Sequence, residues 1–164
     1  MTRNLLDKRM KLLTSELAEM GSLVEKQIYN SIEAFKNKDM KLVKQVMEND
    51  DKVDELNRRI EEQCLKFMAM ESPVATDLRK VFTTSKIVTD LERMADYAVD
   101  ICKIAKRVES DVLGEECDPI WQMVDILRKM INKSIEAFVA GDVDAAYEIC
   151  KICLLYTSPS PRDA

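Results

Sequence analysis

Apolar side chains recur every three or four residues over long stretches of this chain, and that spacing restricts the possible folds more than any other feature. Over residues 4–37 the apolar positions are Leu6, Met10, Leu13, Leu17, Met20, Val24, Ile28, Ile32 and Phe35. In an α-helix this spacing places all of them along one face. The pattern therefore predicts a long amphipathic helix over residues 4–37.

Two further stretches carry the same spacing. Between residues 40 and 69 the apolar positions are Val43, Val46, Val53, Leu56, Ile60, Cys64 and Phe67. From about residue 75 to residue 109 the same spacing runs through Leu78, Phe82, Ser85, Val88, Leu91, Ala95, Ala98, Ile101, Ala105 and Val108, all of them apolar except Ser85. Asp39 is a suitable N-cap for the second helix, and Pro73 breaks the chain before the third. Three long helices joined by short loops pack antiparallel, so the sequence predicts an all-α, up-down-up three-helix bundle.

A five-residue segment recurs in the second half of the chain. Ser31-Ile32-Glu33-Ala34-Phe35 returns as residues 134–138, and at the same offset of 103 residues Asp39 corresponds to Asp142. A repeated segment indicates a repeated structural unit. We expect residues 1–110 to form the first three-helix bundle. Residues 111–152, with a helix beginning near Asp118, are expected to be the start of a second bundle.

The end of the chain departs from this repeat. The offset would place acidic residues at positions 153, 154 and 157, but these positions hold cysteine, leucine and threonine. The last residues, which include Pro159 and Pro161, abandon the helical composition and resemble the translation of a common sequencing adapter. We therefore expect residues 153–164 to be a non-native tail and the native protein to continue past Ile152.

Acidic residues line one stripe of the third predicted helix and interrupt the apolar face of the second. Glu92, Asp96 and Asp100 are four residues apart, so their carboxylates align and require a counter-charge. In the second helix Asp50 falls where an apolar residue is expected, and Asp54 lies one turn later. Asp54 and Glu92 are almost equally distant from the turn near residue 72, so the two groups should lie at the same height.

Carboxylates held together in a partly apolar setting must either take up protons or bind cations. We therefore expect a metal ion to be bound by Asp50, Asp54, Glu92, Asp96 and Asp100. Ligation by oxygen admits magnesium, calcium, manganese and iron alike, and the identity of the expected metal is left open among iron, magnesium, manganese and zinc. A solvated acidic face is the alternative, because surface helices commonly carry such residues.

The composition excludes several classes of function. The chain has no histidine, which rules out histidine-based catalysis and the Glu-x-x-His sites of di-iron bundles. A net charge of -5 and the lack of a basic cluster argue against binding to nucleic acid. The sequence shows no apolar run long enough to cross a membrane and no signal peptide, so we expect a cytoplasmic protein without direct membrane insertion.

Four motifs occur together over about residues 1–152. They are Glu19-Met20-Gly21, Asp50-Asp51-Lys52-Val53-Asp54, Pro73-Val74-Ala75-Thr76-Asp77-Leu78-Arg79 and Asp90-Leu91-Glu92-Arg93-Met94-Ala95-Asp96-Tyr97-Ala98-Val99-Asp100. The P-x-A-x-D-L-R and D-L-E-R-x-x-D patterns are specific in combination, although each alone is weak. With these motifs the chain resembles PhoU-type phosphate-uptake regulators.

The resemblance implies two three-helix bundles, each with an E-x-x-x-D motif that binds a metal ion or a multinuclear metal cluster on its surface. Glu92 and Asp96 match the motif ligands directly, whereas Asp50, Asp54 and Asp100 are additional expected ligands. Asp100 stands where the family often has asparagine. The second motif would lie beyond the part of the second bundle that this sequence contains.

The resemblance also implies a negative regulator of phosphate uptake and phosphate-starvation signalling that is not an enzyme. Its implied partners are the ATPase subunit of a phosphate ABC transporter and a membrane sensor histidine kinase, and we expect a homodimer. Asp77 and Arg79 are expected either to pair or to shape the surface. A helix-capping role for Asp77 is an equal alternative.

Two other functional classes stay open. A structural helical scaffold would carry the same acidic residues without using them. A carboxylate-bridged oxidase or metal-storage bundle would also place acidic ligands on long helices, but such sites use Glu-x-x-His motifs that this chain lacks.

Overall fold

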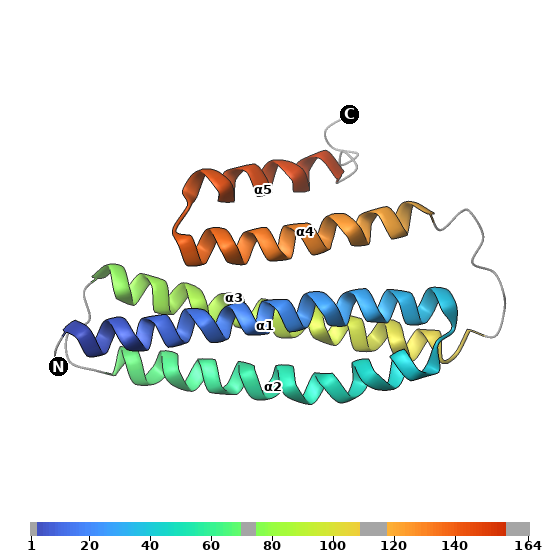
Figure 1. The fold of residues 1–164 in the computed structure, drawn as a ribbon, viewed down its shortest axis with the longest axis horizontal. Helices are drawn as coiled ribbons and strands as arrows, with labels where there is room; N and C mark the ends of the chain where they lie inside the picture. Colours follow the sequence, from blue (N-terminus) through green and yellow to red (C-terminus); the bar gives the residue numbers. More distant parts are fainter. Residues whose placement is uncertain (1–2, 70–74, 109–117, 157–164) are drawn as a thin grey trace, which may run out of the picture.

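The computed structural model describes residues 3–69, 75–108 and 118–156. Five helices make up this part of the chain: α1 Arg3–Asn37, α2 Met40–Met68, α3 Ala75–Ala105, α4 Asp118–Ala140 and α5 Val143–Tyr156 (Figure 1). No strand is present in the described segments. The prediction of an all-α fold is confirmed, whereas Pro73 and the linker before Asp118 lie outside the described residues.

The three helices α1, α2 and α3 run up, down and up and pack on one another (Figure 1). The reversal between α1 and α2 takes place at Lys38, whose φ of 53° is in the left-handed region. Asp39 then caps α2, because its side chain accepts hydrogen bonds from the backbone N–H groups of Lys41 at 2.8 Å and Leu42 at 3.2 Å. The predicted N-cap is confirmed.

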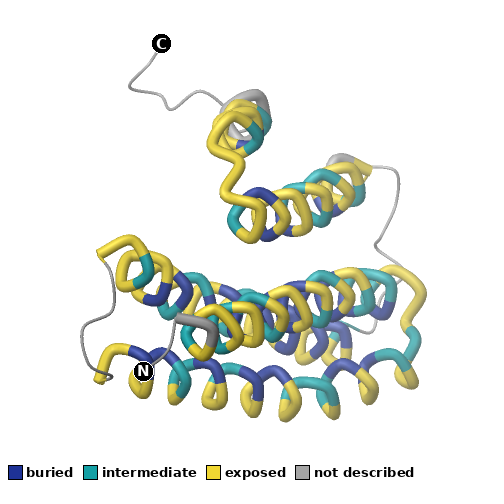
Figure 2. Tube along the Cα trace, turned by 60° about the vertical axis from the view of Figure 1, so that its left-hand side comes forward, coloured by how far each residue is buried: buried dark blue, intermediate teal, exposed yellow. Residues whose placement is uncertain are grey.

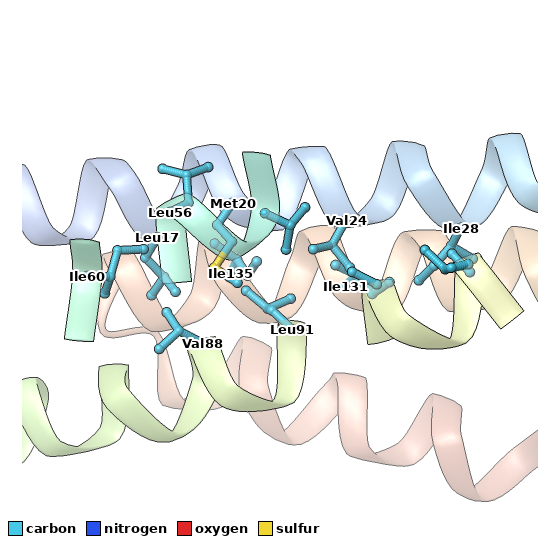
Figure 3. Close-up of a cluster of buried hydrophobic side chains, with 14 of the residues drawn as sticks. Leu17, Met20, Val24, Ile28, Leu56, Ile60, Val88, Leu91, Ile131 and Ile135 are labelled. Carbon is cyan, nitrogen blue, oxygen red and sulfur yellow. The ribbon is translucent and has the colours of Figure 1, made fainter. Parts of the chain in front are cut away.

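The core lies along the shared axis of these three helices. All seven apolar positions predicted for α2 are buried, and they are the residues that face α1 and α3 (Figure 2). Leu17 and Met20 of α1 point into the same space as Ile60 of α2 and Val88 of α3 (Figure 3). Each such side chain contributes about 1.5–3 kcal/mol when it leaves water.

The first turns of α3 differ from the sequence-based expectation. Leu78 and Phe82 are 41% and 55% exposed, and Val81 and Thr84 are buried in their place. A buried threonine is tolerated here because its hydroxyl donates a hydrogen bond of 2.9 Å to the carbonyl of Lys80. From Val88 onward most of the predicted positions are buried, with Cys102 in place of the half-buried Ile101.

The ends of two helices also differ from expectation. α3 stops at Ala105, four residues before the expected end at Glu109, and the N–H of Arg107 bonds the carbonyl of Ile104 at 2.8 Å in a tightened last turn. α5 continues to Tyr156, past the expected end at Ile152, because the prolines that stop a helix come only at positions 159 and 161.

The corner between α4 and α5 repeats the corner between α1 and α2. Gly141 has a positive φ of 71° at the position that corresponds to Lys38. Asp142 caps α5 by accepting a hydrogen bond from the N–H of Ala145 at 2.9 Å. Its own N–H bonds the carbonyl of Ala137 at 2.9 Å, as the N–H of Asp39 bonds Ala34 at 3.0 Å. The sequence repeat is therefore also a repeat of backbone geometry.

α4 lies antiparallel on α1 (Figure 1). Ile131 and Ile135 extend the buried core into α4 (Figure 3), and Gly21 of α1 provides the room for Ile135. Arg128 forms an ion pair with Glu25 and lies 4.2 Å above the ring of Tyr29. Glu25 and Arg128 are 103 residues apart, which is the offset of the repeat, so the contact joins equivalent positions of the two units.

Gly21→Ala should weaken the docking of α4, although alanine favours a helix over glycine by about 1 kcal/mol. A Cβ at position 21 would lie 1.9 Å from Cδ1 of Ile135, and such overpacking costs about 1–3 kcal/mol. Trp121, the single tryptophan, reports docking by its fluorescence because Lys36 of α1 lies over its ring. Adding Ile135→Val removes the overlapping methyl and should restore the signal; a double variant as weak as Gly21→Ala would contradict this contact.

Lys38→Gly should raise the free energy of unfolding by roughly 0.5–1 kcal/mol, because lysine is strained in the left-handed conformation that glycine adopts freely. The equivalent corner already has glycine at position 141. Urea unfolding measures the change. The matched control is Lys44→Gly within α2, which should lower stability by about 1 kcal/mol. Equal losses in both variants would show that Lys38 is not strained.

Candidate functional site

The acidic residues singled out in the sequence come from two packed helices. Asp50 and Asp54 lie on α2, and Glu92, Asp96 and Asp100 lie on α3. Both helices are long and are held in register by the buried residues on either side, such as Val46 and Val53 around Asp50. The apolar packing therefore determines which carboxylates meet.

Four of these carboxylates act on one another across the α2–α3 contact. Burial raises the pKa of Asp50, and the charges of Asp54 and Asp96 raise it further. Burial is also the largest cause of the raised pKa of Glu92, and the charges of Asp96, Asp54 and Asp50 raise it further. The expectation that the acidic groups of the two helices lie at the same height is confirmed for these four residues.

The four carboxylates differ in their exposure. Asp50 and Glu92 are half-buried, whereas Asp54 and Asp96 are exposed. The fifth, Asp100, is exposed and bonded to Lys103 of its own helix, with 2.8 Å between Nζ and Oδ1. The structure thus brings four of the predicted residues together and pairs the fifth with a neighbouring lysine.

A residue of α1 completes the surroundings of Asp50. Gln27 is 2% exposed, and its Nε2 donates a hydrogen bond of 3.0 Å to Oδ1 of Asp50. This bond favours the charged form of Asp50 and so opposes the rise in its pKa. Its Oε1 is buried and has no hydrogen-bond partner among the described residues. Sequence reasoning missed Gln27, although a polar residue between Val24 and Ile28 on the apolar face of α1 was a visible signal.

The acidic group is not a closed coordination shell. Within the described segments, no three acidic or cysteine side chains are placed so that they could hold a metal ion. The donor set nevertheless fits a hard cation, which prefers carboxylate and amide oxygens. A cation here would neutralise like charges that burial makes costly, and the orphaned Oε1 of Gln27 adds a further oxygen beside Asp50.

Asp77 and Arg79 lie apart from this group. Asp77 is half-buried in the first turn of α3, where a carboxylate stabilises the positive end of the helix dipole, and Arg79 is exposed. Asp77 precedes Glu92 by fifteen residues in the same helix, which is about 22 Å. These two residues therefore belong to a different region of the surface.

The helices of the described segments are too polar or too short to cross a membrane.

Comparison with known proteins places these features in a family. The family model described as PhoU domain matches residues 17–105, more than half of the chain, and this range includes all five acidic positions and Gln27. The phosphate-specific transport system accessory protein PhoU homolog of Clostridium acetobutylicum is 42% identical over 152 residues, covering 92% of this chain and 69% of that protein. The Escherichia coli accessory protein PhoU is 31% identical over 141 residues, covering 84% of this chain and 57% of the relative.

Two solved structures share the fold. The crystal structure of PhoU from Pseudomonas aeruginosa superposes with a TM-score of 0.81 and 28% identity, covering 96% of this chain and 82% of that one. The phosphate transport system regulatory protein PhoU from Streptococcus pneumoniae gives a TM-score of 0.80 at 25% identity, covering 89% of this chain and 69% of that one. The family match, the identities and the shared fold agree, and the chain belongs to the PhoU domain family.

Proposed function

We propose that this chain acts as an accessory protein of phosphate transport that restrains phosphate uptake and phosphate-starvation signalling. The support is the family: its relatives at 31% and 42% identity are named as phosphate-specific transport system accessory proteins, and the Streptococcus pneumoniae protein is named as a regulatory protein. The proposed partners are the ATPase subunit of a phosphate ABC transporter and a membrane sensor histidine kinase. The proposal includes a cytoplasmic location and a homodimer.

Metal binding is the chemical part of the proposal. Glu92 and Asp96 of α3, together with Asp50 and Asp54 of α2, bind a metal ion or a multinuclear cluster of iron, magnesium, manganese or zinc. The carrying observation is that Asp50 and Glu92 are half-buried and lie within the electrostatic reach of the other two carboxylates. Asp100 can coordinate the metal only when its ion pair with Lys103 is broken.

A bound cation supplies positive charge that lets the carboxylates of α2 and α3 stay ionised side by side. These residues then present one neutralised surface that spans both helices, and the regulator docks on its partners without turning over a substrate. The absence of histidine from the sequence supports a role in binding over acid–base catalysis. A scaffold is the competing function, and it makes no use of a cation.

The variant Glu92→Gln/Asp96→Asn should lose cation binding and the stability that a cation adds. At a concentration a hundred times its dissociation constant, a cation stabilises the wild-type fold by about 2.7 kcal/mol. Isothermal titration calorimetry and thermal unfolding with Mg²⁺, Mn²⁺, Fe²⁺ and Zn²⁺ measure both effects. Asp90→Asn removes an exposed carboxylate from the same helix and should leave them unchanged.

Two results would contradict metal binding. One is a wild-type protein that none of these cations binds or stabilises. The other is a Glu92→Gln/Asp96→Asn variant that binds as tightly as the wild type. A scaffold predicts that the double variant gains stability through reduced repulsion and that cations have no effect on either protein.

The cation-free protein should lose part of its stability as the pH rises through the titration of Asp50 and Glu92. The pKa of each is raised in the folded state, so the folded state holds more protons than the unfolded state above the ordinary values of 3.8 and 4.5. The free energy of unfolding that these groups contribute is fully present below those values and is lost as the pH rises through the raised pKa. Urea unfolding of the wild type and of Asp50→Asn/Glu92→Gln between about pH 4 and pH 7 gives the difference. The gap between the two proteins should widen in favour of the variant with rising pH; a constant gap would contradict the shifts.

A further inference from the structure

Gln27 occupies a position where a polar side chain is costly. It lies on the apolar face of α1 between Val24 and Ile28 and is 2% exposed. Its Nε2 has a hydrogen-bond partner, but its Oε1 has none among the described residues. A buried polar atom without a partner typically costs about 1–3 kcal/mol. An apolar side chain of similar shape would avoid that cost, so folding alone does not account for glutamine here.

Among the described residues, the side-chain hydrogen bond of Gln27 is directed at the acidic group. Its Nε2 donates to Oδ1 of Asp50, the carboxylate that interrupts the buried face of α2. The bond restricts the orientation of that carboxylate from α1, while the charges of Asp54 and Asp96 also act on it. Asp50 thus has both a neutral hydrogen-bond donor and other carboxylates as neighbours.

We propose that Gln27 is a positioning residue for the divalent cation of the acidic group, acting through Asp50. The proposal rests on the metal binding proposed above. Gln27 holds one oxygen of Asp50 and leaves the other for the cation. Its buried Oε1 is an acceptor for water carried by a hydrated cation. α1 therefore contributes to a site whose ligands all come from α2 and α3.

A second glutamine shows what a purely structural contact of this kind looks like. Gln63 of α2 donates a hydrogen bond to Glu16 of α1. Glu16 also forms an ion pair with Arg59, with 3.0 Å between Oε1 and Nε. Gln63 joins the same two helices as Gln27, but its partner carboxylate already has a cationic side chain beside it. Neither Gln63 nor Glu16 has an unpartnered buried atom among the described residues.

The test compares Gln27→Met with Gln63→Met in the full chain. Methionine keeps the length of glutamine and favours helices, so both variants should fold. The dissociation constant for Mn²⁺ is measured by calorimetry, and the stability without cation by urea unfolding. Loss of a positioning partner typically weakens metal binding 10–100-fold. We expect that loss for Gln27→Met with unchanged or higher cation-free stability, and no change in Mn²⁺ affinity for Gln63→Met.

A double-variant cycle tests whether Gln27 acts through Asp50. Asp50→Asn should weaken Mn²⁺ binding, and adding Gln27→Met to it should produce little further loss, because the bond that Gln27 made is already altered. Additive losses would overturn the proposal.

The remaining outcomes also decide the proposal. Unchanged Mn²⁺ affinity in Gln27→Met overturns it and leaves the metal site standing. A fall in cation-free stability that accounts for the lost affinity, or an equal loss in Gln63→Met, assigns Gln27 a structural role and overturns it as well. A wild-type protein that does not bind Mn²⁺, Mg²⁺, Fe²⁺ or Zn²⁺ overturns both the metal site and the role of Gln27.

Discussion

The apolar contact of α2 with α1 and α3 is the interaction on which the rest of the structure depends. Seven side chains of α2 are buried in it, and the regular spacing fails only around Asp50. Burial on both sides of the gap, at Val46 and Val53, sets the height of α2 against α3. Carboxylates that repel one another can stay close because this packing supplies far more free energy than the repulsion among a few like charges removes.

This arrangement makes a few polar groups unfavourable in free energy within a bundle that apolar packing stabilises. Asp50 and Glu92 have raised pKa values because burial and neighbouring carboxylates both disfavour their charged forms. Gln27 adds a buried oxygen without a partner beside them. Each of these costs would fall if a cation were present, and each would fall equally if the residues were replaced by apolar ones. These costs, at one level of a packed bundle, are the observations from which we propose that this level binds a cation.

The sequence predicted the structure best where the side chains were clearly apolar or were residues that typically begin or end helices. The buried face of α2 and the cap at Asp39 followed from spacing and residue type alone. The first turns of α3 did not, because Phe82 outweighs Thr84 on any scale of hydrophobicity while a threonine can satisfy its hydroxyl on its own helix. The bond from Gln27 to Asp50 was equally hidden, because it depends on side-chain direction, whereas Lys103 was visible in the sequence as a nearby counter-charge for the acidic stripe that includes Asp100.

The pairing of Glu25 with Arg128 bears on the ancestry of the fold. The two positions are equivalent in the two halves, so α1 and α4 meet about an approximate twofold axis. A single-unit ancestor that dimerised through this face would have set residue 25 against its own copy, and two glutamates there would repel. In a single chain the two equivalent positions can carry opposite charges. The ion pair therefore favours the fused arrangement and discourages the first half from pairing with a copy of itself through α1.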